Sequence, residues 1–444
     1  MQLTVLGAGR SAGFLIEYLT ELVMERNFPS ILVIDRAPFS GFQMKEELKE
    51  QVSWLVADLE DDSFIDNVVE TSDIVISLLP VAMHLKVAKL CLKHGKHLAT
   101  ASYVSEGMKA LHQEAESKGL VFLNEMGLDP GIDHLSSSEM LKEIKQWEGE
   151  VESYESYCGG LVHEKSEVNP NPWGYKFSWN PRNVILAGQG GDSIWLENGS
   201  KCCVPPMSLF NYSKNITIPG SNSSDLDAYP NRDSLSYQEI YKLQSAKTLI
   251  RGTLRRSGFC SAWQCLVDAG FTSPEKNREI QGRNWFINLT GFNFTTEWTA
   301  HLLNSGKISE STRSKLDFLE LDRGIQQENE SNADVLERLL VEKWKLDELD
   351  RDEVIMYHSI QYKMQERWYK MSSVMTLVGE GNGRTAMAKS VGLTLAIGVE
   401  LLINNEITQK GVIVPIFQPW GLKVLNKLKK FGIEFEEFIE LNPQ

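Results

Sequence analysis

The stretch NEMGLDPGIDHL, residues 124–135, concentrates acidic and imidazole side chains in a short space: Glu125, Asp129, Asp133 and His134. Carboxylates and imidazoles bind metal ions and transfer protons. Asp-Pro-Gly is also a turn signature by itself, because Pro fixes φ and Gly accepts unusual backbone angles. The four side chains lack a clear metal-ligand spacing, so we expect no metal here. Whether the stretch is an acid/base centre or only a turn depends on the element that it follows.

A second candidate is the glycine-rich stretch VLGAGRSAGFL near the N-terminus. A G-x-G-x-x-A/G turn between a strand and a helix lets backbone N–H groups approach a pyrophosphate, and the helix dipole favours that negative charge. An apolar run precedes the stretch and a helical pattern follows it, which is where the motif must lie. We therefore expect a dinucleotide cradle formed by Gly7, Gly9, Arg10, Ser11 and Ala12.

The next apolar run ends in VIDR, at Asp35 and Arg36. The spacing from Gly7 exceeds that of the compact motif because the first helix is long. A carboxylate here accepts hydrogen bonds from a ribose 2′-OH and repels a 2′-phosphate, which favours NAD over NADP. Arg36 would attract that phosphate, so NADP is the alternative cofactor.

Further cofactor contacts are expected at the carboxyl ends of the later strands, where open parallel sheets bind ligands. The residues at these positions are Ala57, Asp58, Leu79, Pro80, Ala101 and Ser102. Burial in the strand is the alternative interpretation for Leu79. His84, at the start of a helical pattern, is expected to be structural or exposed.

The hydrophobic pattern predicts the strands and helices that would position these residues. The first 125 residues alternate strand-like apolar runs with amphipathic helical patterns, which predicts a parallel, doubly wound sheet. After residue 135, strand-like runs with Gly and Asn turns favour a more antiparallel sheet. Residues 261–364 show a helical pattern; a strand (WYKMSSVMTLVGEG), a long helix (TAMAKSVGLTLAIGVELLIN), and a final strand and helix follow.

Composition bounds the class of protein. A chain of 444 residues with 42% hydrophobic and 24% charged residues fits two or three globular domains. A net charge of −15 without a Lys/Arg stripe disfavours nucleic-acid binding. The six cysteines form no C-x-x-C pair, and neither a signal peptide nor an apolar run of about 18 residues is present. We expect a cytoplasmic protein with reduced thiols and no membrane span.

Several ordered stretches outside the cradle resemble one enzyme family. ISLLP, TASYVS, NEMGLDPGIDH, SYCGGL, NPWGYKFSW, YPNRDS, TLIRGTLR and, near the C-terminus, GRTAMAKSVGL closely resemble saccharopine dehydrogenases of the L-glutamate-forming type, also called saccharopine reductases. The resemblance implies a dimeric cytosolic oxidoreductase of lysine and 2-aminoadipate metabolism. In that reaction NAD(P)⁺ takes a hydride from the carbon beside the secondary amine of saccharopine. Hydrolysis of the imine gives L-glutamate and 2-aminoadipate 6-semialdehyde, and the reverse reaction joins them.

The resemblance also implies roles for single residues. Saccharopine carries three carboxylates, so its site needs fixed cations. The implied substrate-binding residues are Ser102, Tyr103, Asp129, Cys158, Gly159, Arg232, Arg251, Gly252 and Thr253. Additional implied cofactor contacts are Leu128, Asp129, Pro130 and Ser178, with Lys176 as either a cofactor neighbour or an ion-pair partner. Asp129 is the implied counter-ion of the amine and the candidate catalytic residue, and no metal is required.

The implied architecture is a Rossmann domain, an α/β domain with a mixed sheet for substrate binding and dimerisation, and a helical insertion. We expect the Rossmann domain at residues 1–130 plus about 385–444, the α/β domain at 131–262 plus about 365–384, and the insertion at 263–364. The loop at 161–173 departs from the family pattern, which puts substrate identity in question.

Two other functions are compatible with parts of this pattern. A carboxynorspermidine or homospermidine-type reductive aminase shares the fold but acts on diamines, and therefore needs more carboxylates and fewer arginines around its substrate. A catalytically silent NAD-binding regulator would need only the cradle. YPNRDS and IRGTLR argue against both.

Overall fold

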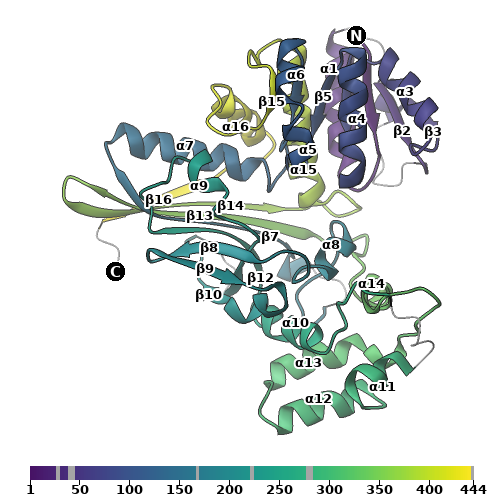
Figure 1. The fold of residues 1–444 in the computed structure, drawn as a ribbon, viewed down its shortest axis with the longest axis vertical. Helices are drawn as coiled ribbons and strands as arrows, with labels where there is room; N and C mark the ends of the chain where they lie inside the picture. The colour runs from purple at the N-terminus through teal and green to yellow at the C-terminus, as the bar shows by residue number, and fades with distance from the viewer. Residues whose placement is uncertain (27–30, 39–45, 167–169, 221–224, 277–283, 442–444) are drawn as a thin grey trace. The chain divides into compact units, whose positions relative to one another are not determined.

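The computed structural model describes residues 1–26, 31–38, 46–166, 170–220, 225–276 and 284–441. The chain forms two compact units (Figure 1): Met1–Gln146 with Asn382–Glu434, and Trp147–Gly381 with Phe435–Gln444.

A seven-stranded parallel sheet forms the first unit. Its strand order is β15-β6-β5-β4-β1-β2-β3, and every neighbouring pair is parallel. The strands are β1 Leu3–Leu6, β2 Ile31–Asp35, β3 Val52–Val56, β4 Ile74–Ser77, β5 His97–Thr100, β6 Val121–Leu123 and β15 Gly411–Ile413. The alternation of apolar runs and helices correctly predicted this sheet, and β1 between β4 and β2 marks where the strand order reverses.

Nine helices of the first unit lie within the described residues. They are α1 Ala12–Arg26, α2 Glu46–Lys49, α3 Asp62–Thr71, α4 Val81–His94, α5 Glu106–Lys109, α6 His112–Ser117, α7 Ile132–Gln146, α15 Ala386–Ile403 and α16 Gly421–Lys429. Helix α15 packs closely on the start of α1. A Cβ at Gly392 would lie only 2.9 Å from the carbonyl oxygen of Ser11, the residue before α1. A glycine is therefore needed for this approach.

Helix α15 is also long and apolar enough to cross a membrane by length and composition. Among the described residues it is the one helix with this property, and 78% of its apolar window is buried inside the protein. Burial against α1 and the sheet is the environment of a core helix.

The second unit contains a nine-stranded mixed sheet. Its order is β10-β11-β12-β7-β13-β14-β16, with β8 pairing β12 and β9. The strands are β7 Glu150–Val162, β8 Ser193–Glu197, β9 Ser200–Val204, β10 Lys214–Ile216, β11 Leu226–Pro230, β12 Thr248–Arg256, β13 Asp352–Met364, β14 Arg367–Val378 and β16 Glu436–Leu441. Among the described strands of this sheet, β12 and β7 pair in parallel and the other pairs are antiparallel, as the turn-rich sequence predicted.

Helical segments of the second unit surround an aromatic core. They are η1 Glu164–Ser166, α8 Pro181–Ile185, η2 Pro206–Tyr212, α9 Tyr237–Ile240, α10 Phe259–Asp268, α11 Asn284–Thr290, α12 Thr295–Asn304, α13 Glu310–Leu319, η3 Leu321–Arg323 and α14 Asn332–Lys343. Trp173 contacts Phe259, Trp263 and Trp344 with ring centroids 5.2–6.1 Å apart. Figure 1 shows α11, α12 and α13 as a group of their own.

The structure differs from the predicted elements in four places. Residues 352–364, predicted helical, form strand β13, because a strand buried on both faces carries apolar residues without alternation. Val184 and Ile185, which begin the strand-like run VILAGQGGDSIWLENG, lie instead in α8, which Asn180 caps. Helix α7 belongs to the first unit and residues 436–441 form β16 in the second sheet, so both expected domain boundaries shift.

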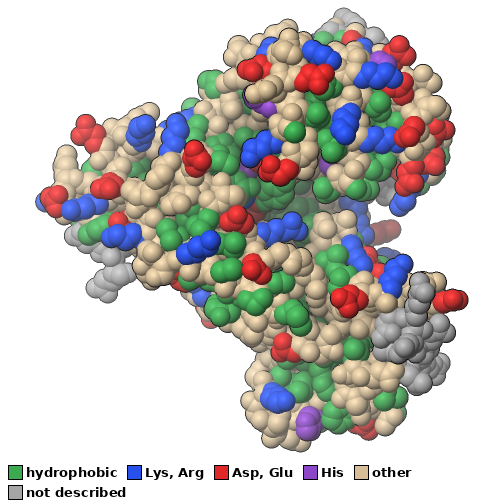
Figure 2. Space-filling model, in the orientation of Figure 1, with side chains coloured by type: hydrophobic (Ala, Val, Ile, Leu, Met, Phe, Trp, Pro, Cys, Tyr) green, Lys and Arg blue, Asp and Glu red, His purple; other side chains and the backbone are tan. Residues whose placement is uncertain are grey.

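Opposite charges are interspersed on the surface of the first unit. On the face drawn in Figure 2, Lys and Arg side chains lie among Asp and Glu side chains rather than in one stripe. This mixed pattern is the one that favours solubility.

The buried carboxylate of Glu400 connects three helices of the first unit, α1, α15 and α16. Glu400 on α15 accepts hydrogen bonds from Tyr18 on α1 at 2.5 Å and from Lys427 on α16 at 2.6 and 2.8 Å. Burial opposes ionisation of Glu400, but the Lys427 and Tyr18 hydrogen bonds outweigh it and lower its pKa below 4.5. The same contact and burial raise the pKa of Tyr18.

This network predicts a pH-dependent contribution to stability. A group with a lowered folded pKa contributes fully above its unfolded pKa and loses that contribution as pH falls. We expect Glu400→Gln to cost about 1–3 kcal/mol near neutral pH, because Lys427 loses its buried partner. The gap in thermal unfolding midpoint between the wild type and this variant should shrink below about pH 4.5.

The exposed pair Lys363–Glu366 provides the control. Glu366→Gln should change stability by less than about 0.5 kcal/mol at every pH. If the difference in unfolding midpoint between the wild type and Glu400→Gln stays constant from neutral to acid pH, the proposed contribution of Glu400 to stability is wrong.

Candidate functional site

The glycine-rich turn lies between β1 and α1, at the carboxyl edge of the parallel sheet. Gly7 has φ +93°, and a Cβ there would lie 3.0 Å from the backbone of Leu78, whereas a Cβ at Gly9 would meet nothing within 4 Å. Ala12 starts α1, and Arg10 and Ser11 precede it. Backbone N–H groups at the start of a fifteen-residue helix, beside an open Gly9, fit a bound pyrophosphate.

Asp35, at the end of β2, is bonded to the backbone of this turn. Its Oδ2 accepts the N–H of Ala8 at 2.6 Å, and its Oδ1 accepts the N–H of Ala37 at 3.1 Å. Each oxygen thus already accepts one backbone N–H group, which leaves fewer acceptor positions for a ribose hydroxyl. Arg36, directly after Asp35, and Arg10, two residues after Ala8, are both exposed.

The other predicted cofactor residues follow successive strands, as expected for a ligand-binding edge. Ala57 and Asp58 follow β3, and the N–H of Ala57 donates to the carbonyl of Asp35 at 3.0 Å. Asp58 itself accepts the N–H of Glu60 at 2.9 Å. Leu79 is buried and Pro80 caps α4, and Ala101 and Ser102 follow β5.

Residues 124–131 connect β6 with α7, which begins at Ile132, so the stretch lies at the same edge of the sheet. Asp129 is half-buried there, and its Oδ1 accepts the hydroxyl hydrogen of Tyr103 at 2.8 Å. Tyr103 is 43% exposed. The structure therefore brings together Asp129 and Tyr103, two of the predicted substrate residues, although they are distant in sequence.

Backbone contacts close this loop tightly. The N–H of Gly127 donates to the carbonyl of Pro130 at 2.9 Å, and the N–H of Ile132 donates to the carbonyl of Gly127 at 3.0 Å. Gly131 has φ +145°, and a Cβ there would lie 2.2 Å from the oxygen of Gly127. The Asp129–Pro130 peptide bond is cis. Leu128 and Pro130 are buried on either side of Asp129.

The remaining ionisable residues of the stretch face inward. Glu125 accepts the N–H of Val104 at 2.9 Å and lies 3.0 Å from Nε2 of His134. Asp133 lies 3.4 Å from Nδ1 of His134 and accepts the N–H of Gly131 at 2.6 Å. His134 is fully buried. These contacts shape the loop, and no cluster suited to a metal ion occurs among the described residues.

His84, expected to be structural or exposed, is buried beside a predicted site residue. Its Nδ1 lies 2.9 Å from Ser77 Oγ, and its Nε2 lies 2.7 Å from Ser102 Oγ. Burial lowers the pKa of His84 to about 4. The sequence could not indicate these contacts of His84, because a His in the first turn of a helix belongs to no recognisable motif.

Predicted substrate residues of the second unit lie on two adjacent strands. In the register of β7 and β12, Thr253 is opposite Cys158, and Gly252 is opposite Tyr157. A Cβ at Gly252 would lie 2.6 Å from the Tyr157 ring, and one at Gly159 would lie 2.6 Å from the Leu254 carbonyl oxygen. These two glycines permit close packing, and Cys158 is buried.

Arg251 and Arg232 are held near each other by backbone contacts. The N–H of Asn231 donates to the carbonyl of Arg251 at 2.8 Å, and the Ser234 hydroxyl accepts the N–H of Arg251 at 3.0 Å. Arg251 is buried, and its guanidinium lies 4.0 Å from the centre of the Tyr237 ring. Arg232 is exposed at the turn after β11 with φ +52°. A buried cation within β12 and an exposed cation in the turn after β11 thus lie on segments that are bonded to each other.

Lys176 is an ion-pair partner, the second of its two expected roles. Its ammonium lies 2.7 Å from Asp350 and 3.5 Å from Asp347, and both Lys176 and Asp350 are buried. Ser178, two residues further along, is also buried.

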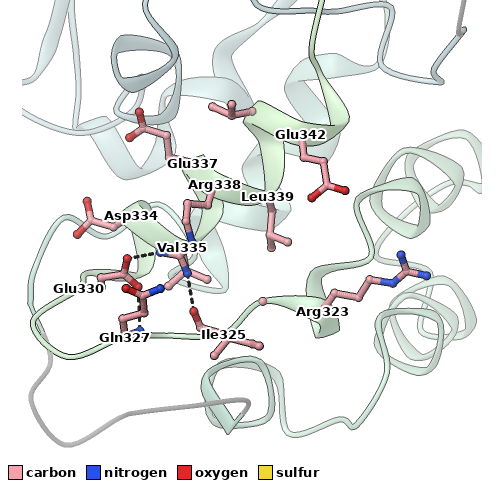
Figure 3. A pocket seen from close by; sticks show the side chains of 12 residues that line it. Arg323, Ile325, Gln327, Glu330, Asp334, Val335, Glu337, Arg338, Leu339 and Glu342 are labelled. Atoms are coloured by element: carbon pink, nitrogen blue, oxygen red, sulfur yellow. Dashed lines mark hydrogen bonds and ion pairs between the residues drawn. The ribbon is translucent and has the colours of Figure 1, made fainter.

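A pocket of about 770 Å³ lies elsewhere in the second unit, among η3, the connection that follows it, and α14 (Figure 3). Arg338 crosses it to pair with Glu330 and to donate to the Ile325 carbonyl. None of the predicted site residues lines this pocket. We therefore assign the pocket no role in the chemistry.

Comparison with protein families places both halves of the sequence in one family. Residues 3–123 match the model of the saccharopine dehydrogenase NADP binding domain, and residues 127–433 match the saccharopine dehydrogenase C-terminal domain. The chain belongs to the saccharopine dehydrogenase family. The resemblance seen in the sequence motifs is therefore confirmed.

Curated relatives of this saccharopine dehydrogenase family member fall into two groups by length. The NADP(+)-dependent, L-glutamate-forming saccharopine dehydrogenase of Pyricularia oryzae is 33% identical over 398 residues, which cover 86% of this chain and 87% of the relative. The alpha-aminoadipic semialdehyde synthase of Arabidopsis thaliana is 34% identical over 413 residues. The match covers 86% of this chain but only 38% of that relative, so the chain spans less than half of the longer proteins.

Solved structures agree with the family assignment. The apo L-glutamate-forming saccharopine dehydrogenase of Saccharomyces cerevisiae matches with a TM-score of 0.83 and 27% identity over 99% of both chains. Homospermidine synthase of Legionella pneumophila in complex with NAD matches with a TM-score of 0.58 and 11% identity, over 99% of this chain and 91% of that one. The second match shows a shared fold alone. A nicotinamide cofactor was predicted correctly, but the family domain is an NADP domain, whereas NAD was favoured.

The closed loop gives a direct test. We expect Gly131→Ala to lose at least about 2 kcal/mol of stability, because the methyl group would overlap the Gly127 backbone at a φ that alanine rarely adopts. The measurement is the thermal unfolding midpoint. Gly191→Ala, where a Cβ meets nothing within 4 Å, should stay within about 0.5 kcal/mol of wild type. Equal midpoints for the two variants would disprove the tight closure.

Proposed function

We propose that this protein interconverts saccharopine and water with L-glutamate and 2-aminoadipate 6-semialdehyde, using NADP⁺ and NADPH. The observation that carries the proposal is the Asp129–Tyr103 pair, held by a closed loop at the same sheet edge as the dinucleotide cradle. The family match over residues 3–123 and 127–433 supports it. The names of the fungal relatives give NADP(+) and the L-glutamate-forming reaction for those proteins.

The first unit would hold the cofactor. Backbone N–H groups of the cradle and the α1 dipole would bind the pyrophosphate. With Asp35 engaged by the Ala8 and Ala37 N–H groups, the exposed Arg36 and Arg10 are our candidates for the 2′-phosphate. When bound, the nicotinamide supplies hydride acceptance or donation. Ala57, Asp58, Leu79, Pro80, Ala101, Leu128 and Pro130, along the same edge, and Ser178 remain proposed cofactor contacts.

Asp129 would hold the amine of the substrate. The hydrogen bond from Tyr103 orients the Asp129 carboxyl group, and a carboxylate in this position would attract a cationic amine. In the reductive direction Asp129 would keep the new amine protonated. In the oxidative direction it would accept the proton that leaves the amine. Ser102 would contact both cofactor and substrate.

Two arginines of the second unit would bind carboxylates. Arg232 is exposed and Arg251 is buried against the Tyr237 ring, and each guanidinium has the planar fork of donors that matches a substrate carboxylate. Thr253 adds a hydroxyl, and Gly252 and Gly159 keep the strands close. Cys158 would serve as a small wall residue, because no covalent step is needed.

The two alternatives have weaker support. A diamine-specific reductive aminase shares the fold with the homospermidine synthase structure, but that likeness is 11% in sequence and extends to the fold alone. Arg232 and Arg251 suit carboxylates rather than ammonium groups. A silent regulator would have no need for the Asp129–Tyr103 pair. We also propose a homodimer and a cytoplasmic location, which the motif resemblance implies.

A spectrophotometric assay separates these functions. Purified protein with saccharopine and NADP⁺ should produce the NADPH absorbance band, and NAD⁺ should support at least about tenfold lower kcat/KM because it lacks the 2′-phosphate. A signal with carboxynorspermidine and none with saccharopine would favour the aminase. No signal with either substrate in either direction would leave only the regulator.

Arg232 offers a second test of the proposal. Arg232→Ala should raise KM for saccharopine at least about tenfold with a smaller change in kcat, because a lost charge-assisted pair weakens binding. Arg323→Ala is the control, since Arg323 is exposed in η3 and pairs with Glu320. A KM for Arg232→Ala within about twofold of wild type would rule out its role.

A further inference from the structure

A buried line of three polar side chains joins the ends of two neighbouring strands of the first unit. Ser77 Oγ lies 2.9 Å from His84 Nδ1, and His84 Nε2 lies 2.7 Å from Ser102 Oγ. Ser77 is fully buried, His84 is 5% exposed, and Ser102 is half-buried. The line therefore runs from the core toward a residue that reaches solvent.

The line lies between the two parts of the site that this unit contributes. Leu78, directly after Ser77, packs against Gly7, where a Cβ would lie 3.0 Å from the Leu78 carbonyl. At the other end, the Ser102 carbonyl accepts the N–H of Glu125 at 3.2 Å, at the base of the loop that carries Asp129. Ser102 is thus anchored on both its backbone and its side chain.

His84 carries a single ring proton near neutral pH. Burial lowers its pKa to about 4, so the ring is neutral and one nitrogen donates while the other accepts. If Nδ1 carried the proton, Ser77 would accept it and Ser102 would donate to Nε2. If Nε2 carries the proton, Ser77 donates to Nδ1 and Ser102 accepts.

Ser77 decides between these tautomers. Within the part of the chain that the structure describes, the Ser77 hydroxyl has one side-chain hydrogen-bond partner, His84 Nδ1. If Nδ1 were the donor, the proton of this fully buried hydroxyl would have no acceptor, which is costly. The favourable arrangement has Ser77 donating to Nδ1 and Nε2–H donating to Ser102.

We propose that His84 is a positioning residue that makes Ser102 a hydrogen-bond donor toward the bound ligand. Because Ser102 Oγ accepts from Nε2–H, its own proton is left to be donated away from the core. The matching ligand group is a carbonyl-type oxygen, either the carboxamide of the nicotinamide or a carboxylate of the substrate. For the identity of that ligand, the inference rests on the proposed function.

Histidine NMR tests the tautomer without any need for turnover. In protein labelled with ¹⁵N-histidine, the His84 signals are assigned by their loss in His84→Phe. We expect Nε2 protonated and Nδ1 bare near neutral pH, and a changed Nδ1 chemical shift in Ser77→Ala, because the bare nitrogen loses its hydrogen-bond donor. A wild-type Nδ1–H tautomer or an imidazolium ring would overturn the proposal, as would an Nδ1 chemical shift that is the same in Ser77→Ala as in the wild type.

A double-mutant cycle tests the connection to Ser102. Ser102→Ala and His84→Phe should each lower kcat/KM for saccharopine at least about tenfold, and the double variant should lose no more than Ser102→Ala alone. His84→Gln, whose amide N–H can replace Nε2–H, should regain part of the loss. Losses that multiply in the double variant would show that His84 acts independently of Ser102.

Two further measurements complete the design. His94→Gln on the same helix is the control, because His94 pairs with Asp66 at the far end of α4 and should keep wild-type kinetics. NADPH binding by fluorescence distinguishes the acceptor: Ser102→Ala weakens it if the carboxamide is the partner and leaves it unchanged if a carboxylate is. A wild type that does not turn over saccharopine defeats the proposed function, while the NMR result still decides the role of His84.

Discussion

The site in the first unit depends on one steric constraint, the contact between the backbones of Gly127 and Gly131. Any Cβ at Gly131 would lie 2.2 Å from the Gly127 oxygen, so only hydrogen atoms can occupy that space. With the loop closed, Asp129 lies at its tip and meets Tyr103, and Glu125 reaches the Val104 N–H. The loop and the segment after β5 are thereby fixed to each other.

Buried polar groups support this arrangement, and two histidines do so in different ways. His134 lies between the carboxylates of Glu125 and Asp133, so it contributes to the shape of the loop. His84 lies between two hydroxyls, and burial holds its pKa near 4. Histidine therefore serves as a partner for carboxylates at position 134 and as a neutral donor and acceptor at position 84.

Asp35 shows how a motif can be recognised correctly and still mislead about its ligand. The rule that an acid after the second strand binds a ribose hydroxyl assumes that the carboxylate faces the cofactor. Here both oxygens accept backbone N–H groups of neighbouring turns, and the family domain is one for NADP. Sequence position identified the residue, but its hydrogen bonds depend on how two loops meet.

The sequence by itself determined the parallel sheet, the glycine cradle and the family, because these depend on local patterns: apolar periodicity, glycine spacing and ordered motifs. It could not distinguish β13 from a helix, because a strand covered on both faces carries no alternation. Only the tertiary structure placed Tyr103 against Asp129 and Ser77 and Ser102 on either side of His84. Those contacts join residues from different strands, and the distance between such residues is set by sheet order and loop closure, which no local pattern encodes.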